Sequence, residues 1–542
     1  MQKFWILNIK SRKEILLSIL TGLFLGVSFP PISASVFLFV ALIPYLFVIQ
    51  NRNGLAEINR ITYLTMFVFG LITIYWVGSW TKEADPFLMI SGIALLFFNP
   101  ILFLIPSTLY YLAAKNFGKK ISIYLFPIFW VFYEYIYSVT DLKFPWLTLG
   151  NGLVSLNTFI QISDTIGVYG LSLVVLYINV LLYLTIVDYF ELRKVRIVKL
   201  VLTLTLVVFP LIYGSIKKSE YKPSLEKIRF GIIQPNLNPW NKWQEGNLNN
   251  LLDIYFDLSD KAIDQGAKIL VWPETALPVY LTMGSYENEL QRIKNYLRIR
   301  NVFLLTGMPD ATIFYDKINA PAEAKPLQDT TSVYTSYNSI FLMNPYNNVI
   351  QKYGKQKLVP FGEKVPFVEY IPFLGDVIKW NVGISSWNTG KDTTVFKLKF
   401  SNIKDSVRIG GVICIESIYS DYVAQFADKG AEILVIVTND SWYGNSSGPY
   451  QHKEYAELRA VENRKFVVRS ANGGISCVID PSGKTLAQTK MFTRKYLVAD
   501  VGFSSAKTFY SKNPMIIPLF SVAFVATVIL IILLRKFIVR KK

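Results

Sequence analysis

The chain has 542 residues, more than one domain usually contains, and 52% of them are hydrophobic while only 17% are charged. The formal net charge is +18, but many basic residues flank apolar segments, which favours a membrane topology over nucleic-acid binding. One histidine and two cysteines argue against a four-ligand zinc site and a disulfide scaffold, although one disulfide between Cys414 and Cys477 stays open.

Eight apolar segments approach the roughly 20 residues that a transmembrane helix needs. They lie near residues 14–31, 34–50, 61–80, 88–114, 121–139, 165–188, 199–216 and 513–535. The first two are short and share the break at Phe29-Pro30-Pro31, which predicts a tight hairpin. The first span shows no clear cleavage site for a signal peptidase.

Basic residues predict the orientation, because Lys and Arg accumulate on the cytoplasmic side. In an eight-span arrangement, five basic groups fall on one side: Lys3, Lys10, Arg12 and Lys13; Arg52 and Arg60; Lys115, Lys119 and Lys120; Arg193, Lys194, Arg196 and Lys199; and Arg535, Lys536, Arg540, Lys541 and Lys542. We therefore expect seven spans in 1–217, an extracytoplasmic domain in 218–512, and the eighth span with a cytoplasmic tail in 513–542.

The extracytoplasmic region reads as alternating short strands and helices, which predicts an α/β domain large enough for a full core. Expected strands lie at 228–234, 268–272, 302–308, 338–343, 394–398, 407–414, 433–437, 466–471 and 475–479. Expected helices lie between Leu248 and Ala262 and at 285–299, 419–429 and 450–464.

Two apolar loops each have two interpretations. Residues 140–164 contain Phe144-Pro-Trp-Leu-Thr-Leu-Gly150, which is either an interfacial aromatic anchor or a wall that admits lipid. Residues 366–388 are aromatic and punctuated by proline. They form either a loop folded over the core or an arm that touches the bilayer.

Cys414 ends an apolar run at the carboxyl end of an expected strand, where α/β folds usually expose their reactive groups. A cysteine attacks as the thiolate and needs a base or a cationic neighbour near neutral pH. In a strand, Cys414 and Glu416 would share one face. The alternative is that Cys414 is a small buried hydrophobic residue, which is how we interpret Cys477.

Two other stretches could assist a thiol. Glu274, in Val271-Trp-Pro-Glu274, follows a strand and could act as a base, or it could cap a helix or form an ion pair. Lys355, Lys357 and Glu363 surround a Pro-Phe-Gly turn, where a lysine could stabilise an oxyanion or simply be a surface charge.

Together these stretches resemble the nitrilase superfamily, whose triad of Glu, Lys and Cys occurs in this chain order. With the eight spans, nearly the whole chain resembles the apolipoprotein N-acyltransferase family of bacterial membrane enzymes. The most specific motifs are Trp-Pro-Glu274, Lys355-x-x-Leu-Val-Pro-Phe-Gly-Glu363, Cys414-x-Glu416, Thr438-Asn-Asp-Ser-Trp442 and Gly448-Pro-x-Gln-His452. The resemblance implies an αββα nitrilase-like sandwich beside the helical membrane domain.

The resemblance also implies roles for single residues. Glu274 is the expected general base, Lys355 the transition-state stabiliser and Cys414 the nucleophile. Glu363 and Glu416 match supporting positions.

Further positions match the family or depart from it. Trp243 and Trp442 match aromatic positions near the acyl-binding region. No catalytic role is implied for His452. Ile415 stands where the family often has an aromatic residue, and 309–335 is longer than such an enzyme requires.

The implied reaction transfers an acyl chain from a membrane phospholipid, through a cysteine thioester, to the α-amino group of a diacylglyceryl-cysteine on an apolipoprotein. It needs no metal or organic cofactor and no nucleic acid. We expect a monomer in the bacterial inner membrane with its catalytic domain on the periplasmic side. The alternatives are a membrane-tethered nitrilase or amidase, or a transporter with a binding domain, although the spans contain few charges.

Overall fold

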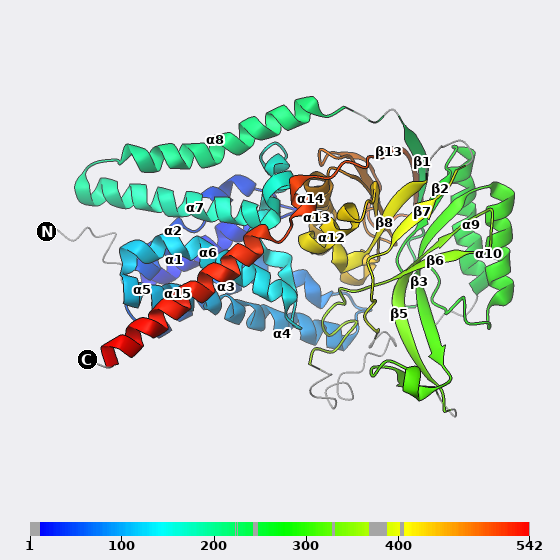
Figure 1. Cartoon of the computed structure of the whole chain (residues 1–542), viewed down its shortest axis with the longest axis horizontal. Helices are drawn as coiled ribbons and strands as arrows, with labels where there is room; N and C mark the ends of the chain where they lie inside the picture. The colour runs from blue at the N-terminus through cyan, green and yellow to red at the C-terminus, as the bar shows by residue number, and fades with distance from the viewer. Residues whose placement is uncertain are drawn as a thin grey trace. The chain divides into compact units, whose positions relative to one another are not determined.

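The computed structural model describes residues 11–222, 224, 226–241, 248–327, 331–367, 387–400 and 406–540. The chain forms two compact units, coloured along the sequence in Figure 1. The helical unit comprises Met1–Gly78, Ile90–Tyr221 and Asn513–Lys542, and the α/β unit comprises Ser79–Met89 and Lys222–Lys512.

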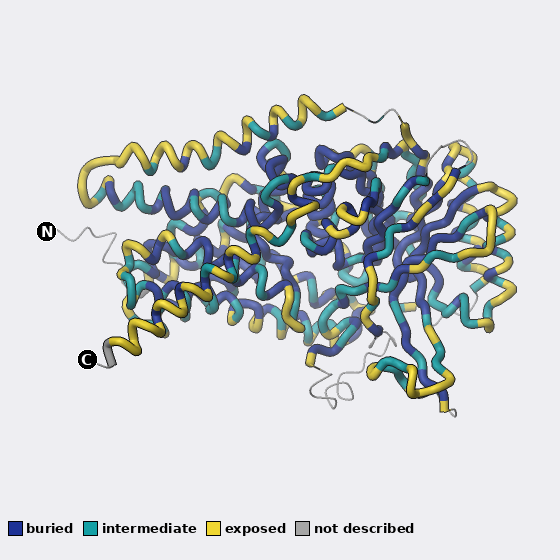
Figure 2. The backbone as a smooth tube through the Cα atoms, viewed as in Figure 1, coloured by how far each residue is buried: buried dark blue, intermediate teal, exposed yellow. Residues whose placement is uncertain are grey.

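Long apolar helices make up the helical unit. They are α1 (Ser11–Val27), α2 (Ile43–Gln50), α3 (Leu55–Thr73), α4 (Pro86–Leu102), α5 (Leu104–Phe117), α6 (Lys119–Val139), α7 (Ser163–Leu192), α8 (Ile197–Glu220) and α15 (Ile516–Arg540). Apolar side chains are exposed along α8 and α15, where Figure 2 shows much of the tube as exposed; Leu204, Phe209, Leu530 and Leu533 are examples. Exposed apolar surface of this extent is typical of contact with lipid.

The number of membrane spans differs from the prediction. Within the described residues, six helical stretches are long and apolar enough to cross a membrane: Leu55–Thr73, Pro86–Phe117, Lys119–Val139, Phe159–Leu192, Ile197–Glu220 and Ile516–Ile538. They correspond to the third to eighth expected spans. The first two expected spans fall on α1, which has 17 residues, and on the shorter apolar stretch Ser35–Gln50. The count of eight is therefore not confirmed.

Several basic segments of the helical unit lie close to one another. Arg52 pairs with Glu14 near the start of α1. The Lys119 ammonium donates to the carbonyl of Gln50 at 2.6 Å, and the Arg535 guanidinium donates to the carbonyl of Asn116 at 2.8 Å. Four of the basic segments expected on one side thus converge at one end of this unit.

The aromatic loop at 140–164 folds into the helical unit as three short 3-10 helices, η3 (Pro145–Leu147), η4 (Leu149–Leu153) and η5 (Phe159–Ile162). Trp146 is buried, and the backbone N–H of Leu149 donates to Glu134 on α6 at 2.8 Å. The aromatic residues of this loop are therefore part of the helical core.

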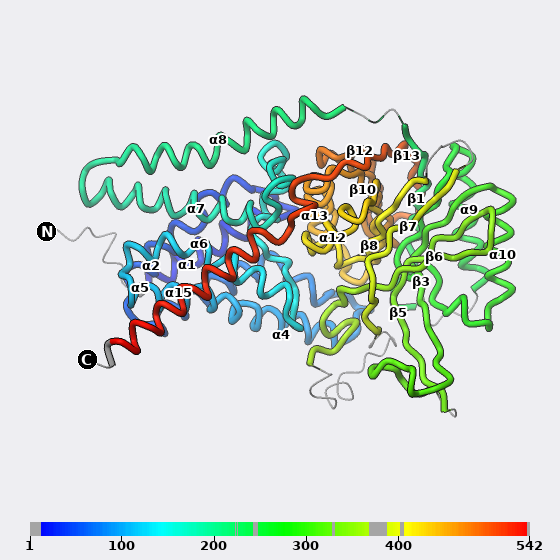
Figure 3. Tube along the Cα trace, viewed as in Figure 1, coloured from blue at the N-terminus to red at the C-terminus, as the bar shows by residue number. Residues whose placement is uncertain are grey.

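Two sheets form the centre of the α/β unit. The first sheet has the order β13-β1-β2-β3-β5-β4, with β6 also pairing with β5, and the second has the order β12-β11-β10-β9-β8-β7. The strands are β1 (Lys227–Gln234), β2 (Ile269–Trp272), β3 (Phe303–Phe314), β4 (Lys325–Pro326), β5 (Val333–Met343), β6 (Ile350–Gly354), β7 (Val395–Leu398), β8 (Val407–Ile413), β9 (Ile433–Thr438), β10 (Phe466–Ala471), β11 (Cys477–Ile479), β12 (Thr485–Gln488) and β13 (Lys495–Gly502). Figure 3 shows β13 beside β1, so the two ends of the unit pair with each other.

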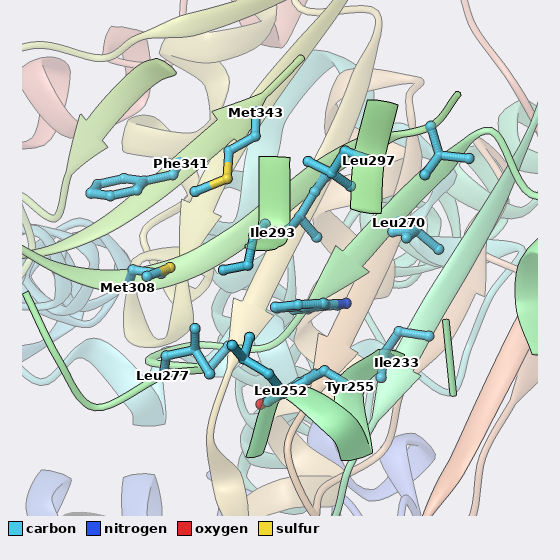
Figure 4. Packing of buried hydrophobic residues seen from close by; sticks show 14 of the residues in the cluster. Ile233, Leu252, Tyr255, Leu270, Leu277, Ile293, Leu297, Met308, Phe341 and Met343 are labelled. Carbon is cyan, nitrogen blue, oxygen red and sulfur yellow. The ribbon is translucent and has the colours of Figure 1, made fainter. Parts of the chain in front are cut away.

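Helices cover the outer face of the first sheet. The buried residues Leu252, Tyr255, Leu258 and Ala262 recur on one face of α9 (Leu248–Asp264), as expected for an amphipathic helix. With α10 (Glu287–Arg300), this face packs on the sheet, and Figure 4 shows residues of both helices and of the strands in one cluster.

The second sheet lies between the first sheet and another helical layer. Neighbouring glycines on β8 show this, because successive residues of a strand point to opposite faces. A Cβ at Gly410 would lie 2.9 Å from Phe426 on α12 (Ser420–Asp428), whereas one at Gly411 would lie 2.9 Å from Ile340 on β5. The Ser470 hydroxyl of β10 also donates to the carbonyl of Ile233 on β1 at 3.0 Å. The layers follow the expected order of helix, sheet, sheet and helix.

The segment 309–335, which is longer than the family requires, extends the first sheet. Strand β3 continues to Phe314 and pairs antiparallel with β5 from Leu304 opposite Met343 to Phe314 opposite Val333. The expected strand ended six residues too early, because residues 309–314 lack the dense apolar pattern of the preceding segment.

Candidate active site

Four buried polar residues meet beside strands β2, β5 and β6; we call them the Glu–Lys cluster. The Lys355 ammonium lies 3.2 Å from Glu274 Oε1 and 2.8 Å from Glu363 Oε1. The Asn338 side-chain amide donates to the same two oxygens at 2.7 and 3.0 Å. Three residues of the predicted site are therefore in direct contact, and Asn338 joins them.

The backbone around Glu274 is closely packed. Strand β2 ends at Trp272, and Pro273 then leads directly to the glutamate. A Cβ at Gly307 on β3 would lie 2.5 Å from Glu274 Cα, so only glycine allows the two backbones to approach this closely. Thr275 has a φ of +45°, in the left-handed region that β-branched residues rarely adopt. The carboxylate is held by a rigid and locally strained turn.

Lys355 and Glu363 are positioned by one short loop after β6. The backbone N–H of Lys355 donates to the carbonyl of Asn338 at 2.8 Å, which continues the pairing of β6 with β5. The second carboxylate oxygen of Glu363 accepts from the N–H of Val359 at 2.9 Å, closing the turn that carries it.

The Glu–Lys cluster holds its lysine in the charged form. Burial alone favours the neutral amine, but the carboxylates of Glu274 and Glu363 outweigh burial and raise the pKa of Lys355 well above its ordinary value. Both glutamates therefore contact the same ammonium.

Cys414 directly follows β8 as the first residue of the 3-10 helix η7 (Cys414–Ile418). Cys414 is free and half-buried; its thiol is hydrogen-bonded with Thr438 and interacts electrostatically with Glu274 and Lys355. Its φ is +50°, which strains an L-residue. Burial and the charge of Glu274 raise the pKa of this thiol, while Lys355 lowers it less. The resting cysteine is therefore protonated.

Glu416 lies in η7 and does not share a strand face with Cys414, so that expectation was wrong. The strand ends at Ile413 because the Glu416 carboxylate turns back and accepts the Ile413 N–H at 2.8 Å. Its other oxygen accepts from the Tyr353 hydroxyl and the N–H of Gln356, each at 2.7 Å. Glu416 thus fastens the Cys414 turn to the loop that carries Lys355.

A second group of buried polar residues contacts the Cys414 turn; we call Asp440, His452 and Arg469 the Asp–His–Arg cluster. His452 Nδ1 lies 2.8 Å from Asp440 Oδ1, and the Arg469 guanidinium donates to Asp440 Oδ2 at 2.6 Å. Burial favours a neutral Asp440, but Arg469 and His452 outweigh it and hold the pKa of Asp440 well below its usual range. On its other side, His452 Nε2 lies 3.0 Å from the carbonyl oxygen of Cys414.

Trp442, expected near the acyl chain, lies in the 3-10 helix η8 (Asp440–Tyr443) and is half-buried. Its ring meets that of Trp240 edge to face, with centroids 4.8 Å apart. Its carbonyl accepts from the Ser79 hydroxyl at 2.5 Å, so the segment Ser79–Met89 supports this turn. Trp243 lies outside the described residues, as does most of the expected arm at 366–388.

The remaining candidates are separate from this site. The Lys357 ammonium stands over the rings of Tyr419 and Tyr422, 5.3 and 5.6 Å from their centroids. Cys477 is buried in β11 and is free, so Cys414 and Cys477 form no disulfide. Among the described residues, no group of three or more His, Cys, Asp or Glu side chains is arranged to hold a metal ion.

Sequence reasoning gave no role to three residues that the structure places at the site. Asn338 lies within β5, and asparagine is depleted in strands, which could have indicated a special role. Arg469 lies within the otherwise apolar β10, where a buried charge needs a partner. Asp440 belongs to the quoted Thr438–Trp442 motif, but its contact with His452 required the fold.

Two family models match this chain. The Apolipoprotein N-acyltransferase N-terminal domain matches residues 21–181, and Carbon-nitrogen hydrolase matches residues 229–510. Over 530 residues, the chain is 30% identical to the apolipoprotein N-acyltransferase of Chlorobaculum tepidum, covering 97% of each chain. The chain belongs to the apolipoprotein N-acyltransferase family. This confirms the resemblance inferred from the motifs and identifies the α/β unit as a nitrilase-like domain.

Other relatives give the same assignment. The apolipoprotein N-acyltransferase of Geobacter metallireducens is 30% identical over 92% of each chain, and that of Rickettsia typhi is 29% identical over 90% of this chain and 91% of its own. Among solved structures, Saccharomyces cerevisiae Nit3, a member of branch 10 of the nitrilase superfamily, is 18% identical and covers 56% of this chain and 96% of its own, with a TM-score of 0.36.

Proposed function

We propose that this chain is a membrane enzyme that transfers an acyl chain from a phospholipid to the α-amino group of the N-terminal diacylglyceryl-cysteine of apolipoproteins. The family supports the N-acyl transfer. The observation that carries the chemistry is the contact of the Lys355 ammonium with both Glu274 and Glu363, within electrostatic reach of the Cys414 thiol.

In the first step, Glu274 takes the proton from Cys414 and the thiolate attacks the ester carbonyl of the phospholipid. The raised pKa of Cys414 supports a base-assisted attack over a preformed thiolate. Lys355 stabilises the oxyanion as it develops, because its charge is already in place and needs no reorganisation. The lysophospholipid leaves with the proton that Glu274 returns, and a thioester remains on Cys414.

In the second step, the amine of the diacylglyceryl-cysteine attacks the thioester. Glu274 accepts a proton from the attacking nitrogen, and Lys355 again stabilises the oxyanion. Collapse of the intermediate gives the amide and regenerates the Cys414 thiol with that proton. The two half-reactions share one site, so we expect ping-pong kinetics.

We further propose a monomer in the bacterial inner membrane, with the α/β unit on the periplasmic side. The gathering of basic segments at one end of the helical unit supports this orientation. Both lipid substrates are held in the bilayer by about 0.8 kcal/mol for each buried CH₂ group. Segments of the helical unit precede and follow most of the α/β unit in the chain, so the α/β unit is tethered at both ends.

An amidase acting on small soluble amides would use the same three residues with water. The family match to an apolipoprotein N-acyltransferase N-terminal domain favours the lipid reaction, since a soluble substrate requires no helical unit. A transporter without chemistry would keep its function after substitution of both Glu274 and Cys414.

The direct test is Cys414→Ser in the full-length protein, incubated with a phospholipid that carries a labelled acyl chain. We expect the native enzyme to accumulate a label that hydroxylamine removes, and the serine variant to give no lipoprotein product. Full activity of the variant would refute the mechanism. Release of ammonia from a soluble amide, independent of lipid, would favour the amidase instead.

A further inference from the structure

His452 is a buried residue of α13 (Ser447–Asn463) that contacts the backbone of the residue carrying the thiol. Its Nε2 lies 3.0 Å from the carbonyl oxygen of Cys414 and 2.8 Å from the hydroxyl of Ser417. Its Nδ1 lies 2.8 Å from Asp440 Oδ1 and 3.1 Å from the Arg469 guanidinium. The ring therefore connects a buried ion pair to the nucleophile turn.

The neighbours of the ring determine which nitrogen carries a proton. A peptide carbonyl can only accept, so the contact with Cys414 requires an N–H at Nε2. The Ser417 hydroxyl fits this arrangement, because it donates to the same carbonyl at 2.8 Å while its oxygen accepts from Nε2. Nδ1 has both an acceptor, Asp440, and a donor, Arg469, within reach. These two contacts fix the orientation of the ring.

These contacts converge on a strained residue. Cys414 adopts a φ of +50°, and a non-glycine residue keeps such a conformation only where its surroundings fix it. Two donors, His452 Nε2 and Ser417 Oγ, fix its carbonyl oxygen. Without them, the peptide would be free to rotate toward an unstrained conformation, and this rotation would move the thiol relative to Glu274.

We propose that His452 is a positioning residue for the acyl transfer. Its Nε2–H, together with Ser417, holds the left-handed backbone of Cys414 so that the thiol points to the base and to the acyl carbonyl. Asp440 and Arg469 fix the ring that does this. The inference rests on the proposed function of Cys414 as the nucleophile, and it predicts an effect on the rate of acylation and none on lipid binding.

The test compares His452→Leu with His452→Gln in the full-length protein, using single-turnover formation of the acyl-enzyme from a labelled phospholipid. A thiol displaced by about 1 Å loses on the order of 10²-fold in rate, so we expect that loss at saturating lipid for the leucine variant. The KM of this variant for the phospholipid should stay within about threefold of the native value, since His452 makes no proposed contact with the bound lipid. The glutamine amide can donate to the same carbonyl, so His452→Gln should recover about tenfold of the lost rate.

Tyr455→Phe is the matched control, because it removes one polar group from the same buried helix, one turn from His452.

An acylation rate of His452→Leu within threefold of the native rate, or a loss confined to KM, would overturn the proposal. If the leucine variant does not fold, Ser417→Ala removes the other donor to the same carbonyl. A lower saturating rate with unchanged KM then supports the proposal, and an unchanged rate overturns it. An active Cys414→Ser variant would instead refute the proposed function, so the two failures are distinct.

Discussion

Two clusters of buried charge meet at Cys414, and they differ in what they contact. The Glu–Lys cluster interacts with the thiol, which is the group that loses a proton in the proposed reaction. The Asp–His–Arg cluster contacts the carbonyl of the same residue, a group that takes no part in the proposed reaction. In the proposed reaction, the first cluster would change the charge of the Cys414 thiol, and the second would fix the geometry of its backbone.

The two clusters also differ in how strongly their carboxylates are bound by positive charge. Two carboxylates compete for one ammonium in the Glu–Lys cluster, which leaves negative charge available to accept a proton. In the Asp–His–Arg cluster, one carboxylate is bound by Arg469 and by His452. A carboxylate held in this way is a poor base, so Asp440 suits a structural role. Substitutions on the two sides should therefore change different measured quantities.

Glu274→Gln should give the largest effect, because it removes the proposed base while keeping the shape of the side chain. We expect acylation of Cys414 to fall by about 10²- to 10⁴-fold, the usual contribution of a general base. The measurement is single-turnover formation of acyl-enzyme from a labelled phospholipid. A loss below about tenfold would assign the proton transfer to another group.

The same variant also makes a prediction about pH. Burial and the charge of Glu274 raise the pKa of Cys414, so the native thiol stays protonated at neutral pH and reacts with iodoacetamide mainly on the alkaline side. Without that charge, Lys355 remains and lowers the pKa, so the midpoint of the alkylation profile should move to lower pH. Variants of His452 remove neither Glu274 nor Lys355, so they should move this midpoint less than Glu274→Gln does, which would separate the two clusters. Cys477 is buried, and Cys414→Ser supplies the background.

Asn338→Ala tests whether the Glu–Lys cluster needs a fixed geometry as well as charge. The Asn338 amide donates to both Glu274 and Glu363, so its loss removes one hydrogen bond from each carboxylate without changing any charge. We expect a loss of about 10- to 100-fold in the saturating acylation rate, because the base is no longer aligned with the thiol. Asn463→Ala is the control, since that buried asparagine donates to the carbonyl of Arg459 at 2.9 Å. Equal losses in the two variants would mean that Asn338 acts only through stability.

The sequence predicted the Glu–Lys side far better than the Asp–His–Arg side. Glu274 and Cys414 directly follow strands, and the carboxyl ends of strands are where α/β folds place reactive groups, so position along the chain was informative. Choosing Lys355 over Lys357 needed the family spacing to Glu363, because both lysines follow the same strand. Without the family, the spacing in the chain could not show which of the two lysines contacts Glu363.

The contacts of His452 could not be predicted from the chain. They join η8, α13 and β10, which follow one another in the chain, to Cys414 in η7, and they form only when the helices pack on the second sheet. The left-handed backbone of Cys414 was also missed, because an apolar run predicts a strand but not the residue at which the strand turns. Trp240 was not singled out either; its contact with Trp442 depends on how two distant loops pack.

Substitution of Lys357 should have the smallest effect on acylation. It tests whether a lysine outside the Glu–Lys cluster matters to the reaction. Lys357 lies two residues from Lys355, yet its ammonium stands over the rings of Tyr419 and Tyr422. Among the described residues, no ion pair joins Lys357 to Glu274 or Glu363. Such cation–π contacts contribute about 0.5–1 kcal/mol at partly exposed sites, so Lys357→Gln should lower the thermal midpoint slightly and leave acylation within about threefold. Lys355→Gln, measured beside it, should lose about 10²- to 10³-fold, the effect of removing one oxyanion donor. Equal losses of acylation rate in the two lysine variants would mean that the general positive charge of the loop after β6 matters, and not the contact of Lys355 with Glu274 and Glu363. The assignment of the Glu–Lys cluster as the side that transfers the proton would then fail.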